Sequence, residues 1–138
     1  MKFLALALAL AVSLPAVPAW AGPIISLDHG SVWQTTKPGQ DTQGFLQIHN
    51  TGDEPDTLTG ANCTIAAGTI LVDAKGNPLT SLVIPAGQTV TLSGTGPHLQ
   101  INGARYRVEK DGILPCSISF ALSGDLIGYL NAIPEPKK

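Results

Sequence analysis

Two cysteines, Cys63 and Cys116, are the residues of this chain best suited to redox or soft-metal chemistry. They could form a disulfide or, as thiolates, bind a metal ion. Three imidazole side chains add borderline ligands: His29, His49 and His98. Taken one at a time, each histidine is more often a surface or strand-end residue than a ligand. Methionine occurs only as Met1, so a mature chain that lacks it cannot build a thioether site.

The first 21 residues have the features of a bacterial secretory signal peptide. Lys2 gives a positive start, residues 3–14 form an apolar run interrupted only by Ser13, and residues 19–21 fit the A-x-A pattern of signal peptidase. The run is shorter than the roughly 20 residues that span a bilayer. A lipid anchor would need a cysteine at the cleavage point, and Gly22 stands there. We therefore expect cleavage after Ala21 and a periplasmic mature protein without a membrane span.

Export favours a disulfide between Cys63 and Cys116. An even number of cysteines in an oxidising compartment usually means a disulfide framework. Closing a loop of this length would stabilise the fold by roughly 4 kcal/mol. The alternative is a thiolate metal site, which the sequence favours less because the ligand spacings of zinc motifs are absent.

Charge and motif content narrow the function classes. Eight Lys and Arg residues against ten Asp and Glu residues give a net charge of −2, which excludes a basic nucleic-acid-binding footprint. The sequence contains neither a Gly-x-Ser-x-Gly elbow nor a phosphate loop. Acidic residues gather at the turn of residues 53–56, where turn formation and solubility explain them. We therefore do not expect an enzyme.

The elements that must position these residues are predicted to be strands. Glycine and proline recur at intervals of roughly ten residues, the spacing of a sandwich or barrel. Outside the leader, apolar residues do not recur at helical spacing. The predicted strands are residues 24–27, 42–49, 57–61, 69–72, 82–84, 89–92, 98–101, 106–108, 116–122 and 126–130. These strands predict one all-β sandwich domain over residues 22–133, followed by a flexible tail at 134–138.

Two details of the strand pattern make specific predictions. Along residues 42–49, Leu46 and Ile48 should face one side of the strand, and Phe45, Gln47 and His49 should face the other. Asn102-Gly103 is a strong hairpin signal, so residues 98–101 should pair with residues 106–108. Arg105 and Arg107 would then lie on a solvated strand edge.

Several segments, in order, carry a resemblance to a known family. Residues 44–52 (GFLQIHNTG), 84–92 (IPAGQTVTL), 96–101 (GPHLQI) and 112–120 are the matching pieces. From about residue 28 to residue 133 the chain resembles periplasmic copper chaperones of the PCuAC type. This resemblance implies a cupredoxin-like Greek-key β-sandwich, copper as cargo, and partners in cytochrome oxidase assembly.

The copper motif of that family is degenerate here. Family members combine two His with Met residues, a soft set that suits Cu(I). His98 stands at the second His, but Gln100 replaces the Met that should follow it, and Val72-Asp73 falls about where the first His should be. His98 is thus the one ligand carried over. Reduced Cys63 and Cys116 could join it as a Cu(I) trio if the three side chains converge.

Two functions follow from these observations. The first is a copper chaperone-like protein that binds and transfers copper, as Cu(I) or Cu(II), through an altered metal site. The alternative is a metal-free β-sandwich that serves as a binding or assembly module and has lost copper binding.

Overall fold

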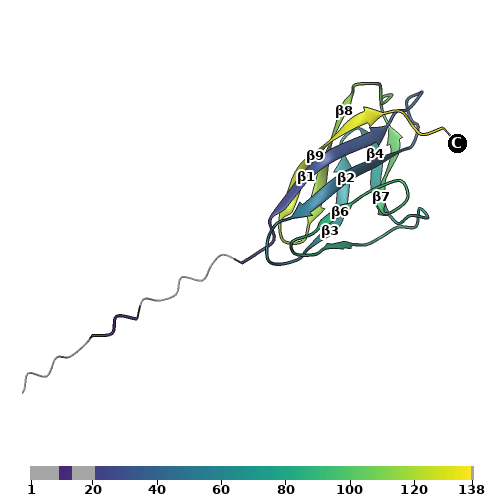
Figure 1. Cartoon of the computed structure of the whole chain (residues 1–138). Coiled ribbons are helices and arrows are strands. Elements are labelled where there is room, and N and C mark those ends of the chain that lie inside the picture. The colour runs from purple at the N-terminus through teal and green to yellow at the C-terminus, as the bar shows by residue number, and fades with distance from the viewer. Residues whose placement is uncertain (1–9, 14–20, 138) are drawn as a thin grey trace, which may run out of the picture.

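Nine β-strands make up the regular structure of the part of the chain that the structure describes (Figure 1). The computed structural model describes residues 10–13 and 21–137, and within these ranges the regular elements are all strands. Most of the predicted signal peptide lies outside the described residues. The strands are β1 (Ile25–Trp33), β2 (Thr42–Asn50), β3 (Asp56–Cys63), β4 (Ala66–Val72), β5 (Leu82–Ile84), β6 (Thr89–Thr91), β7 (His98–Ala104), β8 (Ile113–Phe120) and β9 (Gly124–Ile133).

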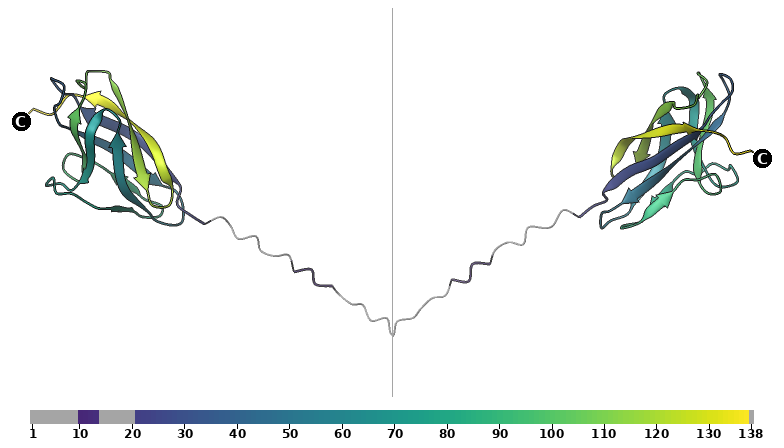
Figure 2. Two further views of the ribbon diagram at one scale, coloured as in Figure 1. Left: turned by 180° about the vertical axis from the view of Figure 1, so that it is seen from behind. Right: turned by 45° about the horizontal axis from the view of Figure 1, so that its top comes forward.

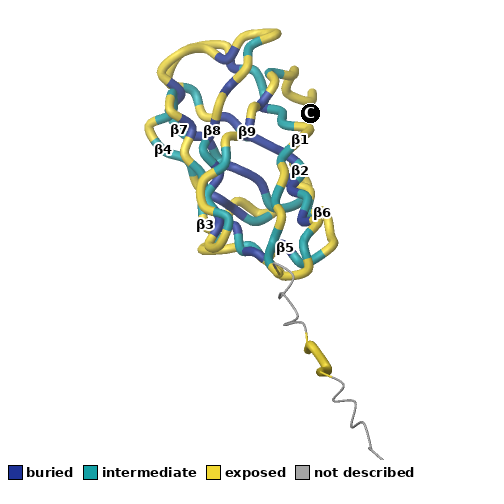
Figure 3. Tube along the Cα trace, turned by 90° about the vertical axis from the view of Figure 1, so that its left-hand side faces the viewer, coloured by how far each residue is buried: buried dark blue, intermediate teal, exposed yellow. Residues whose placement is uncertain are grey.

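The strands form one curled sheet, seen from two further sides in Figure 2. Their order in the sheet is β4-β7-β2-β1-β9-β8-β3-β5, and β6 pairs with β2 outside this sequence. All pairings between named strands are antiparallel except that of β1 with β9. The curl turns one face of the sheet inward along its whole length, and the buried residues collect there (Figure 3). The predicted all-β architecture is therefore confirmed.

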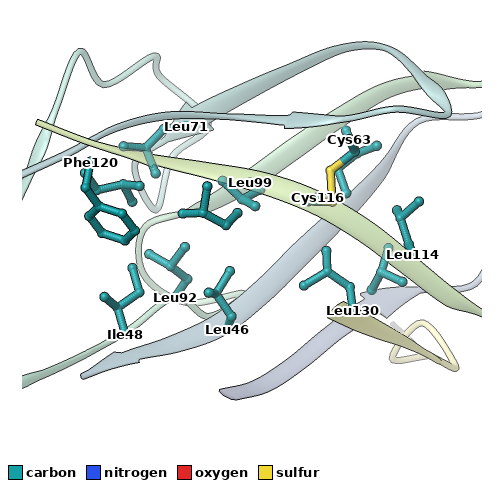
Figure 4. Close-up of a cluster of buried hydrophobic side chains, with 14 of the residues drawn as sticks. Leu46, Ile48, Cys63, Leu71, Leu92, Leu99, Leu114, Cys116, Phe120 and Leu130 are labelled. Carbon is teal, nitrogen blue, oxygen red and sulfur yellow. A yellow bond between two sulfur atoms is a disulfide. The ribbon is translucent and has the colours of Figure 1, made fainter. Parts of the chain in front are cut away.

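Aliphatic side chains from facing strands fill the interior of the curl (Figure 4). Leu46 and Ile48 of β2 are 2% and 0% exposed, whereas Gln47 and His49 between and after them are half-buried. The predicted alternation of β2 is thus confirmed, because period-two geometry sends alternate side chains to opposite faces. Phe45 differs from its outward neighbours, since Trp33 packs against its ring and leaves it 8% exposed.

The predicted hairpin at Asn102-Gly103 is wrong. Both residues lie inside β7, which continues to Ala104 and pairs with β4 along its length. Gly103 does have the positive φ (+62°) that the turn signal anticipates, and its N–H donates to the carboxylate of Asp41 at 2.8 Å. Asn102 pairs with Gly68 of β4 and Ala104 pairs with Ala66, so the ladder with β4 carries the strand on through the predicted turn.

As a consequence, residues 105–110 are loop and not strand. Arg105 and Arg107 therefore do not lie on a strand edge, contrary to the prediction. Arg107 instead forms an ion pair with Glu109 two residues away.

One buried carboxylate ties the β8–β9 turn to β3. Asp56 is 2% exposed and accepts hydrogen bonds from the N–H groups of Leu122 and Ser123, each at 2.9 Å, and from the Ser123 hydroxyl at 2.5 Å. Burial by itself would raise the pKa of Asp56, but the hydrogen bonds, led by that of the Ser123 hydroxyl, outweigh burial and lower it. Asp56 is thus held as a carboxylate that orders the turn.

Candidate functional site

His98 opens β7 directly after the loop that follows β6, and its ring is 3% exposed. Its Nδ1 lies 2.9 Å from the carbonyl oxygen of Gly96. A carbonyl only accepts, so Nδ1 carries the proton of the neutral ring and Nε2 keeps its lone pair. A metal-ligating histidine usually has this arrangement, with one nitrogen held by a backbone carbonyl and the other left to bind the metal.

One aromatic side chain lies beside His98, and a second packs behind it. The ring of Phe45 lies 6.1 Å from the His98 ring, centroid to centroid, and Trp33 packs edge-on against Phe45 at 5.2 Å. The loop before β7 approaches the same pair, since a Cβ added at Gly94 would lie 3.6 Å from the Trp33 ring. His98 therefore sits in an apolar, water-poor environment at the start of its strand.

Gln100 lies two residues after His98 on β7, and both alternate with Leu99 and Ile101, which are fully buried in the core. The side-chain amide of Gln100 donates to Asn102 Oδ1 at 3.3 Å. Oxygen and nitrogen of an amide are hard or weak ligands, which suit Cu(I) poorly. The neighbourhood of His98 thus has the imidazole of the sequence motif and an amide where the thioether would be.

The structure contains the disulfide predicted between Cys63 and Cys116, with an S–S distance of 2.03 Å. The two residues lie directly opposite each other in the β3–β8 ladder. In this oxidised form neither sulfur is a thiolate. The trio of both cysteines with His98, considered from the sequence as a Cu(I) site, is therefore not formed here.

The other two histidines converge on one carboxylate, which the sequence analysis missed. His49 Nε2 lies 2.7 Å from Asp28 Oδ1, and His29 Nδ1 lies 2.9 Å from the same oxygen. The second nitrogen of His49, Nδ1, lies 2.7 Å from Thr89 Oγ1. We refer to Asp28, His29 and His49 as the Asp28 cluster.

Strand pairing brings the members of this cluster together. In the β1–β2 ladder, Asp28 is opposite Gln47 and Ser26 is opposite His49, so Asp28 and His49 are diagonal neighbours. In the β2–β6 ladder, His49 is directly opposite Thr89. Since all of these are long-range pairings, single-strand periodicity carries no sign of them.

A β-bulge puts His29 on the same side as Asp28. Consecutive residues of a regular strand point to opposite faces. The register of β1 shifts between Asp28 and Ser31, and His29 has φ +50°, an uncommon value for a residue other than glycine. Gly30 completes the bulge, because a Cβ there would lie 2.1 Å from the carbonyl oxygen of Tyr129. The Asp-His-Gly triplet was the available sequence signal, since glycine inside a strand often marks a bulge.

The cluster is open to solvent and charged. Hydrogen bonds from His29 and then from His49 hold the pKa of Asp28 below its usual range. The side chains of His29, Asp28 and His49 are 72%, 48% and 26% exposed. A hollow of about 170 Å³ adjoins Asp28 and His29 and continues toward Tyr129 and Asn131 of β9.

Within residues 10–13 and 21–137, no three or more His, Cys, Asp or Glu side chains already surround a common metal position. Over the same ranges there is no helix long and apolar enough to cross a membrane.

Comparison with known proteins identifies both a family and a fold. The profile of a family described as LpqE-like lipoprotein matches residues 25–127. Among solved structures, the apo PCuAC domain from PmoF1 superposes with a TM-score of 0.72 at 20% identity, over 80% of this chain and 94% of that one.

Two copper-containing structures are also similar. The copper-bound PCuAC domain from PmoF2 gives a TM-score of 0.69 at 16% identity, covering 80% of this chain and 93% of that one. CuI-DR1885 from Deinococcus radiodurans gives 0.64 at 19% identity, covering 94% and 85%. At these identities the likeness establishes the fold, and it confirms the predicted cupredoxin-like β-sandwich. A comparison with curated protein sequences finds no match.

Proposed function

Because this chain belongs to the LpqE-like family and has the fold of PCuAC domains, we propose that it is a copper chaperone-like protein that binds and transfers copper outside the cytoplasm. Similarity to the copper-bound domain from PmoF2 and to CuI-DR1885 supports copper as the cargo. The disulfide supports an oxidising compartment such as the periplasm. Assembly proteins of cytochrome oxidase are the partners we propose, by extension from the family.

The observation that carries this proposal is the contact of 2.9 Å between His98 Nδ1 and the carbonyl oxygen of Gly96. The contact occupies Nδ1 and leaves Nε2 as the nitrogen able to bind copper. The apolar wall of Phe45 and Trp33 favours a cation of low charge, such as Cu(I), over a strongly hydrated one.

The site at His98 lacks the thioether ligand that the family motif places two residues after the histidine. Gln100 supplies an amide, so we propose that Cu(I) binding at His98 is weak compared with a relative that has Met in this position. A weak site is compatible with transfer, since a chaperone must release its cargo.

A competition titration tests the proposal. The processed, oxidised protein is titrated with Cu(I) against chromophoric chelators of graded strength, with and without a reductant that opens the disulfide. We expect the protein to bind one Cu(I) and to retain it in competition with the weak chelators only. Opening the disulfide should leave this affinity unchanged. Failure to take Cu(I) from even the weakest chelator would instead favour the metal-free binding or assembly module.

A further inference from the structure

The segment that leads into β1 is held by the turn after β2 through three hydrogen bonds. The N–H of Gly22 donates to Asp53 Oδ1 at 2.8 Å, and the N–H of Ile24 donates to Asn50 Oδ1 at 3.2 Å. The carbonyl oxygen of Ile24 accepts from the N–H of Thr51 at 3.0 Å. A segment before a first strand is usually poorly ordered unless it is tied down. The turn is thus a built binding surface for this segment.

Asn50 holds the turn in place. The residue is 1% exposed, and its side-chain amide makes four hydrogen bonds. Its Oδ1 accepts from the N–H groups of Ile24 and Gly52, while Nδ2 donates to the carbonyl oxygen of Glu54 and to a carbonyl oxygen of β5. Every hydrogen-bonding position of the amide is therefore used, and the turn is fixed on both sides of Asp53.

Gly52 allows the segment to lie flat on the turn. A Cβ at this position would lie 2.1 Å from the carbonyl oxygen of Gly22 and 2.6 Å from the nitrogen of Ile24. Any side chain there would push the segment away from Asp53. Pro23 has a fixed φ, which lowers the conformational entropy that the segment loses when it is held. Both residues favour one position for the nitrogen of Gly22.

We propose that this turn is the binding site for the protein's own processed N-terminus, which the predicted cleavage after Ala21 creates. A signal peptidase hydrolyses the bond between Ala21 and Gly22 with water: the hydroxyl goes to the carbonyl carbon of Ala21, and the hydrogen goes to the nitrogen of Gly22. Near neutral pH the new amine takes up a further proton, since α-amino groups titrate at about 7.7–8.0. The nitrogen that donates as a neutral amide before cleavage is then an ammonium ion paired with the Asp53 carboxylate.

The contact between Gly22 and Asp53 therefore strengthens on maturation. A hydrogen bond from an ammonium to a carboxylate is shorter and stronger than one from a neutral amide. Gly22 is half-buried and Asp53 is exposed, so solvent screening keeps the gain modest. A protein that retains Ala21 carries its ammonium on that residue and keeps only the amide contact at Gly22. Processing thus anchors the start of β1, and this anchoring does not depend on copper.

The experiment compares the processed protein with a form that retains Ala21, each with and without Asp53→Asn. NMR titration of the α-amino group and hydrogen exchange at the Ile24 amide are measured. In the processed wild type, the carboxylate should hold the α-amino pKa above the usual range of about 7.7–8.0. Asp53→Asn should return this pKa to that range and speed exchange at Ile24 about two- to fivefold. With Ala21 retained, Asp53→Asn should leave the α-amino pKa unchanged.

Glu54→Gln is the matched control. Asp53 and Glu54 are the titratable side chains of the turn, whose contacts with β1 and β5 are made by Asn50 and by backbone groups. Glu54→Gln removes the adjacent charge and keeps the backbone contact of Glu54 with Asn50. It should shift the α-amino pKa less than half as far as Asp53→Asn does.

The pH dependence of stability gives a second measurement. Because the ion pair raises the α-amino pKa in the folded state, its contribution is fully present below the unfolded value of about 7.7–8.0. It is lost as the pH rises through the folded value, so urea unfolding of wild type and Asp53→Asn should converge at high pH.

Two results would overturn this site. One is an equal α-amino pKa in processed wild type and Asp53→Asn. The other is an exported protein whose N-terminus, read by mass spectrometry, is a residue other than Gly22. Both would leave the proposed copper function standing, since neither concerns His98.

Discussion

Cys63 and Cys116 face each other across the β3–β8 ladder with a Cα–Cα distance of 4.1 Å, and both are buried in the core. The bond joins two strands that are already neighbours in the sheet. It therefore holds the β3–β8 pairing in place without altering the arrangement of strands around it.

Removal of this disulfide should destabilise the protein strongly. The loop that it closes spans 53 residues of sequence, for which the chain-entropy relation gives a loss of about 4 kcal/mol in the free energy of unfolding. Urea unfolding of the double variant Cys63→Ala/Cys116→Ala, compared with wild type, measures this loss in the free energy of unfolding. Wild type unfolded in the presence of a reductant should have a free energy of unfolding close to that of the double variant. A loss below about 1 kcal/mol in both samples would contradict the prediction.

Asp56→Asn should destabilise the protein near neutral pH by about 1–3 kcal/mol, because the charged acceptor of three hydrogen bonds across the β8–β9 turn is lost. The pKa of Asp56 is lowered in the folded state, below the unfolded value of about 3.9. Its contribution is therefore fully present above that value and is lost as the pH falls through the folded pKa.

Urea unfolding of wild type and Asp56→Asn at about pH 6 and about pH 3 checks this dependence, and the difference between them should shrink in acid. Asp125→Asn, at an exposed position of β9, is the matched control and should cost less than about 0.5 kcal/mol at either pH. A difference that grew in acid would show that the carboxylate does not stabilise the turn.

Gly30→Ala should destabilise the bulge by about 1–3 kcal/mol, since the added Cβ would meet the Tyr129 carbonyl oxygen at 2.1 Å. Gly68→Ala on β4 is the control, because nothing lies within 4 Å of a Cβ there. Thermal unfolding of both variants gives the comparison. Equal melting temperatures for the two variants would mean that β1 and β9 separate easily at the bulge.

Gln100→Met should strengthen Cu(I) binding by at least tenfold, because it places a thioether of nearly the same length two residues from His98. His98→Ala should abolish Cu(I) binding in both the wild-type and the Gln100→Met background. Competition with a Cu(I) chelator measures both effects. Gln100→Leu supplies bulk without sulfur, and a gain with Leu as large as that with Met would assign the effect to packing.

The sequence by itself determined the strand character, the inward-facing residues and the covalent link. Alternation of Leu46 and Ile48 with polar neighbours is local, and so it predicts which face of β2 is buried. The pairing of Cys63 with Cys116 follows from there being only two cysteines in a chain with a predicted signal peptide. The order of matching segments was enough to indicate the family, since a family profile also depends on sequence order.

Tertiary structure alone decided how distant residues meet. Asn102-Gly103 has the local sequence of a turn, yet pairing of Asn102 and Ala104 with β4 keeps it inside β7. His29 and His49 look like isolated surface residues until the register of β1 against β2, and a bulge one residue past Asp28, bring both rings to one oxygen. Local periodicity fixes the direction of a side chain, but the partner it reaches depends on register between strands, which forms only when the sheet does.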